Sequence, residues 1–314
     1  MTTLIYHSGA LGDFVTALPA IARWHALHAH ARRILLGRPS HGRLARDFGL
    51  FDDVWDLDAA QYAPLFCDTS TDTVRALLHG IDAAWLCADP DSPIVRNINL
   101  AGIPEVHAHA PIPRSGTPAA HYHLSHVPGA LPADASTATT QGVLSAARTM
   151  PCATDVPPRT VAVHPGSGSA LKNWPLPRFV EVAQRLHEDG LGILWILGPA
   201  EDGTGLPDGA RVCRSPDLTM LACTLARCTL YIGNDSGITH LAAAVGCPTV
   251  AVFGPSDAAV WTPHGARVRV VRSSTCEVAC HLTKTHRAAT CDRRCLTDVS
   301  VDKVVQVCRE LLAG

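Results

Sequence analysis

Lysine is nearly missing from this sequence of 314 residues. Lys172, Lys284 and Lys303 are the three lysines among 26 basic residues, and 28 acidic residues leave a formal net charge of -2. This balance excludes the strongly basic surface expected of a dedicated nucleic-acid-binding protein. Because arginine supplies almost all of the positive charge, a lysine inside a glycine- and serine-rich segment stands out.

Long apolar runs are also lacking. Glycine or proline interrupts each run well before the roughly 20 residues that a membrane-spanning helix needs. The first residues, MTTLIYHSGALGDF, have no basic segment before an apolar stretch, so no targeting signal is visible. We therefore expect a cytoplasmic protein with at most peripheral contact to the inner membrane. In a reducing compartment its 12 cysteines should be thiols, metal ligands or redox groups.

What the sequence does contain is an alternation of short apolar runs with helical patterns. Apolar runs at 3–7, 32–37, 83–87, 160–166 and 191–199 are each followed by a polar-apolar pattern of helical period or by a turn. This alternation predicts an α/β fold with parallel sheets. The pattern fades between 107 and 158, so we expect two Rossmann-like domains, 1–157 and 158–314.

The segment LYIGNDSGITHLAAAVGCPTVAVFGP, residues 230–255, predicts a strand, a tight turn, a helix and a second strand. A helix that begins at the carboxyl end of a parallel strand presents free backbone N–H groups to an anion. Asp235 could cap this helix, reach ligand hydroxyl groups, or do some of both, while Ser236 and Gly237 face the anion. A cationic or hydrogen-bond-donating His240 could reach the same position.

A second glycine- and serine-rich turn, HPGSGSALKNWP at 164–175, contains Ser167, Gly168 and Lys172. The Lys172 ammonium suits a pyrophosphate oxygen and could neutralise a phosphate leaving group. Glu201 follows a strand in the same half, at the place where a ribose-binding carboxylate is expected.

The first turn, HSGALGDF at 7–14, has Gly9 and Gly12 but no third glycine at the spacing of a dinucleotide-binding fingerprint. Asp13 in this turn could act as a general base or simply cap the helix expected to start at Phe14. Pro19 lies in that helical pattern, so we expect a kink or a short non-helical entry there.

Taken together, these motifs resemble the ADP-heptose:lipopolysaccharide heptosyltransferases of glycosyltransferase family 9. Residues 232–256 and 9–21 are similar to the two signatures of that family, and the likeness spans nearly the whole chain. The resemblance implies a GT-B fold, with two Rossmann-like domains that face each other across a cleft. It also implies an N-terminal acceptor domain, a C-terminal donor domain and a last helix, 299–314, that packs back on the N-terminal domain.

By the same resemblance, the protein would be an inverting, metal-independent glycosyltransferase. Asp13 would be the catalytic base, and Lys172 would neutralise phosphate charge. Asp235, Ser236, Gly237 and His240 would bind the diphosphate and sugar of ADP-heptose, and Glu201 its ribose. The expected acceptor is a lipopolysaccharide core sugar, although His7 departs from the usual arginine and no lysine stands in the N-terminal half. The alternatives are a protein or small-molecule acceptor, or another nucleotide sugar as the donor. A further alternative is a non-catalytic protein that binds a nucleotide or a metal.

Four cysteines, Cys276, Cys280, Cys291 and Cys295, form a C-x3-C-x10-C-x3-C pattern. Two such pairs could bind structural zinc or iron tetrahedrally, although the spacing is looser than the common C-x2-C. The resemblance also points to metal, because a branch of the family that glycosylates autotransporter proteins has a four-cysteine metal site. Free thiols are the alternative.

Overall fold

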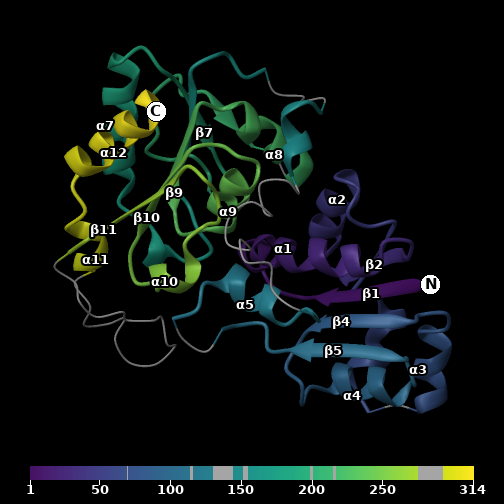
Figure 1. Ribbon diagram of the computed structural model, residues 1–314. Coiled ribbons are helices and arrows are strands. Elements are labelled where there is room, and N and C mark those ends of the chain that lie inside the picture. The colour runs from purple at the N-terminus through teal and green to yellow at the C-terminus, as the bar shows by residue number, and fades with distance from the viewer. Residues whose placement is uncertain are drawn as a thin grey trace. The chain divides into compact units, whose positions relative to one another are not determined.

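The computed structural model describes residues 1–68, 70–113, 116–129, 144–150, 155–198, 201–214, 217–274 and 293–314. The chain divides into two compact units, 1–139 and 140–314. Each unit contains one parallel sheet with helices on it, as Figure 1 shows. In the described part of the chain, no helix combines the length and the apolar character needed to cross a bilayer.

The N-terminal unit contains a five-stranded sheet of order β3-β2-β1-β4-β5. Its strands are β1 (Thr2–His7), β2 (Arg32–Gly37), β3 (Asp53–Asp56), β4 (Ala83–Cys87) and β5 (Glu105–His109). Its helices are α1 (Leu11–Leu27), α2 (Pro39–Asp47), η1 (Ala60–Phe66), α3 (Thr71–Leu77), α4 (Pro93–Leu100) and α5 (Ala119–Ser125). The order reverses between β1 and β4, which is where ligands bind in open α/β sheets.

Alternate residues of the N-terminal strands cover the two faces of the sheet. One face, with Leu4 and Leu86, joins an apolar core that includes Val74 of α3 and Ile98 of α4. On the other face α1 and α5 pack side by side (Figure 1). Helix α1 begins at Leu11 and runs through Pro19, so the expected non-helical entry at the proline is absent from it.

The C-terminal unit contains a six-stranded sheet of order β11-β10-β9-β6-β7-β8. Its strands are β6 (Thr160–His164), β7 (Gly192–Ile196), β8 (Val212–Cys213), β9 (Leu230–Asn234), β10 (Thr249–Phe253) and β11 (Val268–Arg272). Its helices are η2 (Ser145–Arg148), η3 (Ala170–Lys172), α7 (Leu176–Glu188), α8 (Leu218–Arg227), α9 (Gly237–Ala244), α10 (Ala258–Trp261), α11 (Arg294–Thr297) and α12 (Val301–Ala313). Every residue of β6, β9 and β10 is buried, as expected for strands covered on both faces.

The last helix, α12, buries its apolar stripe within the C-terminal unit. Val304, Val305 and Leu311 join the core that α7 provides through Phe179 and Leu186. Each such buried side chain contributes roughly 1.5–3 kcal/mol. These side chains of α12 are therefore buried by its own unit, and the packing on the N-terminal domain that the family resemblance implies stays a prediction.

Candidate functional site

The two glycine-rich turns of the C-terminal unit meet at the switch point of its sheet. Strands β6 and β9 are hydrogen-bonded neighbours, and the chain order reverses between them. Their carboxyl ends lead directly into residues 165–169 and 235–236. The turns that the sequence singled out separately thus lie side by side at the ligand-binding edge of the sheet.

Helix α9 is capped by Ser236 and not by Asp235. Ser236 has an extended backbone, and its Oγ accepts a hydrogen bond from the Thr239 backbone N–H at 3.3 Å. Gly237 is the first helical residue. This corrects the expectation that Asp235 shares the capping role, and the physical reason is that its carboxylate is engaged elsewhere.

Asp235 is paired with Lys172, which comes from the other glycine-rich turn. The Lys172 Nζ lies 2.7 Å from Asp235 Oδ2, and the exposed fractions of the two side chains are 30% and 6%. Such a short contact in a largely buried place is a charge-assisted hydrogen bond that fixes both side chains. It brings the single lysine of the N-terminal 283 residues to the start of α9.

His240 lies beside this ion pair as a neutral ring. Its Nε2 is 4.0 Å from Asp235 Oδ1, and its Nδ1 has no hydrogen-bond partner among the described residues. Burial lowers the pKa of His240 to about 4, despite the opposing effect of the Asp235 carboxylate. The cationic form considered from the sequence is therefore disfavoured near neutral pH in the ligand-free chain, and the ring can offer a single N–H donor.

Asn234 joins the two turns, and the sequence reasoning missed it. This fully buried side chain donates from Nδ2 to the Pro165 carbonyl at 2.7 Å and accepts from the Trp174 backbone N–H at 2.8 Å. Buried amides are costly unless they are hydrogen-bonded, so these contacts fix the spacing of the turns. Its position as the last residue of a buried strand, before Asp235, was an available signal.

Glu201 lies at the rim of a pocket of about 500 Å³ in the same unit. Its carboxylate accepts from the Gly198 backbone N–H and approaches Gly166 so closely that a Cβ there would lie 2.0 Å from Oε1. Arg293, which the sequence reasoning also missed, lines this pocket and donates to the Ala170 and Asn173 carbonyls at 3.1 and 2.8 Å. The other predicted donor residues are not among those that line it.

Ser167 and Gly168 belong to the same turn but serve different purposes. The Ser167 hydroxyl donates to Asn173 Oδ1 at 2.6 Å and accepts from the Ser169 N–H at 3.2 Å, so it holds the turn together. A Cβ at Gly168 would meet no heavy atom within 4 Å, so this glycine borders open space.

In the N-terminal unit, Asp13 follows the turn at the end of β1. Helix α1 begins at Leu11, three residues before the expected start, and Asp13 Oδ2 accepts from the Ala10 backbone N–H at 3.0 Å. Gly9 is required by this close approach, since a Cβ there would lie 2.8 Å from Asp13 Cβ. Gly12 is inside the first turn of the helix. The capping alternative for Asp13 is thus realised, and a role as base needs a separate test.

The predicted cysteine site falls mostly outside the described residues. Cys276, Cys280 and Cys291 are not described, whereas Cys295 is in α11 and is buried in the apolar core beside Leu296 and Val299. The four-cysteine metal site stays a prediction.

Comparison with known proteins shows which family the sequence matches. The profile of glycosyltransferase family 9 (heptosyltransferase) matches residues 128–290. Lipopolysaccharide heptosyltransferase 3 of Escherichia coli is 30% identical over 113 residues, which are 33% of this chain and 33% of that protein. The match therefore covers about a third of the length of this curated relative.

Solved structures extend the likeness to the whole chain. The structure of E. coli ADP-heptose lps heptosyltransferase II has a TM-score of 0.74 at 16% identity, over 100% of this chain and 99% of that one. E. coli heptosyltransferase WaaC with ADP-2-deoxy-2-fluoro heptose has a TM-score of 0.70 at 16% identity, over 99% of each. These likenesses confirm the predicted fold class, the pair of Rossmann-like units known as GT-B. The family profile spans more than half of the sequence, and the chain belongs to glycosyltransferase family 9, the heptosyltransferase family.

Proposed function

We propose that this protein transfers a heptose from ADP-heptose to an acceptor hydroxyl group with inversion at the anomeric carbon, and that the acceptor is a lipopolysaccharide core sugar. The observation that carries the proposal is the Lys172–Asp235 contact of 2.7 Å beside the capped start of α9, in a chain of this family. A nucleotide diphosphate suits this place because the helix start and the ammonium both attract negative charge.

In the proposed reaction the acceptor oxygen attacks the anomeric carbon while Asp13 takes its proton. The bond between that carbon and the β-phosphate oxygen breaks, and ADP leaves with the bonding electrons. Lys172, the N–H groups at the start of α9 and a hydrogen bond donated by the His240 ring stabilise the negative charge on the departing diphosphate. Residues of the chain supply the positive electrostatic environment, so the chemistry itself needs no metal ion.

The proposal assigns acceptor binding to the N-terminal unit and donor binding to the C-terminal unit. Glu201 at the pocket rim would accept hydrogen bonds from the ribose hydroxyl groups. The proposed function also agrees with the expected cytoplasmic location of the protein, because 12 cysteines suit a reducing compartment. The cysteine group at 276–295 would hold structural zinc or iron.

Asp13→Asn tests the assignment of the base. The amide oxygen can still accept from the Ala10 N–H, so the start of α1 should survive, but the amide cannot take a proton. We expect turnover with ADP-heptose to fall by about 10²–10⁴-fold, with ADP affinity within about twofold of wild type. Product is scored by mass spectrometry, and ADP binding by calorimetry.

Asp72→Asn, in the first turn of α3 of the same unit, is the control and should be fully active. Unchanged turnover in Asp13→Asn would show that Asp13 is not the catalytic base.

The wild-type enzyme is assayed with several nucleotide sugars against a heptose-acceptor core, a peptide and small sugars. If no pair of donor and acceptor gives a product, the proposed function itself is contradicted. If only the peptide is glycosylated, the acceptor is a protein and not a lipopolysaccharide core sugar.

A further inference from the structure

Three strands of the N-terminal sheet bring chemically reactive side chains into one row. In the parallel pairing His7 is opposite Cys87, and Cys87 is opposite His109. Residues in register on neighbouring strands point to the same face of a sheet. This is the face that α1 and α5 cover, and the row lies at the carboxyl ends of β1, β4 and β5.

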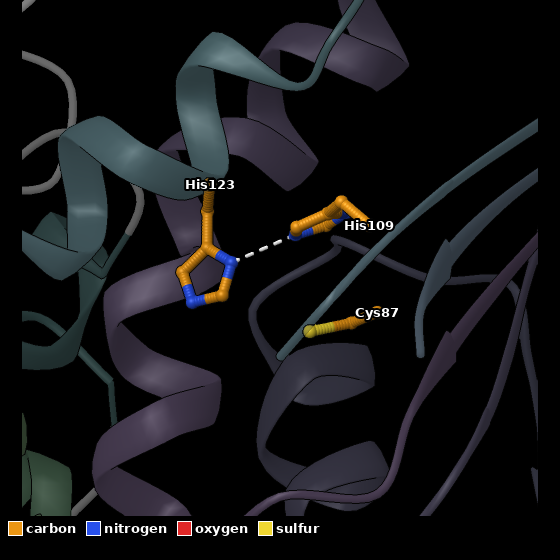
Figure 2. Close-up of side chains that lie close together, drawn as sticks. All are labelled: Cys87, His109 and His123. Carbon is orange, nitrogen blue, oxygen red and sulfur yellow. Dashed lines mark hydrogen bonds between the residues drawn. The ribbon is translucent and has the colours of Figure 1, made fainter. Parts of the chain in front are cut away.

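Helix α5 adds a fourth side chain to this row. His123 is on the buried side of α5, and its Nδ1 lies 2.9 Å from His109 Nε2. Figure 2 shows the His109 ring pointing toward His123, with the Cys87 thiol below the pair. One ligand atom from each of Cys87, His109 and His123 lies within 4.8 Å of the other two.

Hydrogen bonding within the described part of the chain does not satisfy the two imidazoles. Cys87 and His109 are 2% exposed and His123 is fully buried. Each imidazole has the other as its partner, while His109 Nδ1 and His123 Nε2 have no hydrogen-bond partner in the described part of the chain. Leaving a buried polar atom unpaired costs about 1–3 kcal/mol, so two apolar residues would be the more stable choice here.

All three groups are uncharged in the ion-free chain. Burial lowers the pKa of His109 and of His123 to about 3, so both rings are neutral and have a free lone pair. Burial also raises the pKa of the Cys87 thiol to about 12, so the thiol keeps its proton until a cation displaces it.

We propose that Cys87, His109 and His123 bind one transition metal ion, with Zn²⁺ as the best match to a thiolate and two imidazoles. Binding converts the Cys87 S–H into a Zn–S bond and releases one proton to solvent. The proton between the two rings moves to the outer nitrogen of the ring that carries it, so both rings stay neutral and both inner nitrogens bind the ion. The site ties α5 to the ends of β4 and β5, and it uses none of the cysteines at 276–295.

The two imidazoles need a small rearrangement to share an ion, and the Cys87 sulfur, within 4.8 Å of both, must move by up to roughly 1.3 Å to reach a tetrahedral spacing. Two nitrogens bound to one tetrahedral zinc at roughly 2.0–2.1 Å lie about 3.3 Å apart, so the observed 2.9 Å must open by roughly 0.4 Å. His7 stands next to Cys87 in the row, and its Nδ1 is buried without a hydrogen-bond partner among the described residues. It is the neighbouring candidate for a fourth ligand, although it is outside the group of three ligand atoms that lie within 4.8 Å of one another.

The test begins with a background in which Cys276, Cys280 and Cys291 are serine, so that the other candidate site cannot contribute. Because the cluster is buried, the protein is expressed in medium containing Zn²⁺ or Co²⁺ and then dialysed against chelator. We expect about one equivalent of metal per chain and, with cobalt, a thiolate-to-metal absorption band. Less than a tenth of an equivalent, with either metal, would overturn the proposal.

Cys87→Ser should remove the thiolate band, and His123→Gln should weaken Zn²⁺ binding by more than the 10–100-fold that loss of an outer-shell partner typically costs. His126→Gln is the matched control, because His126 is on the same segment and stacks on His109 at 4.7 Å without belonging to the ligand group. Cys67→Ser controls for an exposed thiol. Metal content unchanged in both ligand variants would also refute the site.

A measurement on the background protein alone covers variants that do not fold. The chain is unfolded in chelator and refolded with or without Zn²⁺. An ion that binds the folded state alone raises the thermal midpoint with its concentration. A midpoint that Zn²⁺ leaves unchanged would contradict the proposal.

Discussion

Lys172 and Asp235 satisfy each other's charge in the ligand-free chain, and this has a consequence for catalysis. A diphosphate at the start of α9 would compete with Asp235 for the ammonium, which lies 2.7 Å from its carboxylate. The pair therefore keeps Lys172 oriented before the donor binds, and preorganised charge is what lowers a barrier. Removing the lysine leaves a carboxylate that is nearly buried and unpaired.

Lys172→Ala should accordingly affect both activity and stability. We expect transfer to fall by about 10²–10³-fold, as for loss of one preorganised donor, and the free energy of unfolding to fall by about 1–3 kcal/mol. Initial rates and urea unfolding followed by circular dichroism measure the two effects.

Lys303→Ala provides the comparison, since Lys303 is an exposed lysine in the first turn of α12. It should match the wild type in both assays. Equal losses in the two variants would show that Lys172 has no particular role in the donor site.

At the scale of elements, the turn after β6 depends on two glycines with opposite surroundings. Gly166 faces the Glu201 carboxylate, where a Cβ would lie 2.0 Å from Oε1, while Gly168 faces open space. The two positions are two residues apart in one turn. Alanine at Gly166 and alanine at Gly168 therefore distinguish a clash with Glu201 from the general effect of adding a methyl group to this turn.

Gly166→Ala should displace the Glu201 carboxylate from the Gly198 N–H and from the pocket rim. Because Glu201 is a flexible side chain, the fold should survive, with a change in thermal midpoint of a few degrees at most. We expect the affinity for ADP to fall by about tenfold, because one hydrogen bond to the ligand is lost. Gly168→Ala should bind ADP like the wild type. Calorimetric titration with ADP decides between them; equal affinity in all three proteins would remove Glu201 from the donor site.

At the scale of the whole molecule, buried histidines in both units make the stability of the fold depend on pH. Outside the Cys87 cluster, burial lowers the pKa of His25 to about 3, of His41 and His240 to about 4, and that of His164 in the same direction. The ordinary value is 6.5. Between the folded and unfolded pKa values the unfolded chain binds more protons, so stability is complete above pH 6.5 and falls as the pH drops toward 4.

Acidification from pH 7 to pH 5 should therefore lower the free energy of unfolding steeply, by on the order of 2 kcal/mol for each of His25, His41 and His240. This window lies above the ordinary pKa of carboxylates, so they contribute little there. His25→Phe should reduce the pH dependence, because the ring packs against Phe51 and its Nε2 has no hydrogen-bond partner in the described residues. Urea unfolding at several pH values measures it, and a flat profile between pH 7 and 5 would contradict the expectation.

Much of the fold and part of the site follow from short stretches of the sequence. The period of the apolar residues predicts the parallel strands and helices, and the glycine spacing locates both turns, because these preferences act within a few residues. Family 9 membership also rests on such local signatures. Ser236 as the cap of α9 was missed because Asp235 and Ser236 are equally good caps by type, and the choice depends on where Lys172 lies.

By itself, then, the sequence determined the two α/β units, their turns and the candidate residues Asp13, Lys172 and Asp235. Only the tertiary structure decided which side chains meet: Lys172 with Asp235, Asn234 with both turns, and Cys87 with His109 and His123. The physical reason is that strand register and side-chain direction are set by packing between segments far apart in the chain. A shift of one residue in one strand would turn Cys87 to the opposite face of the sheet.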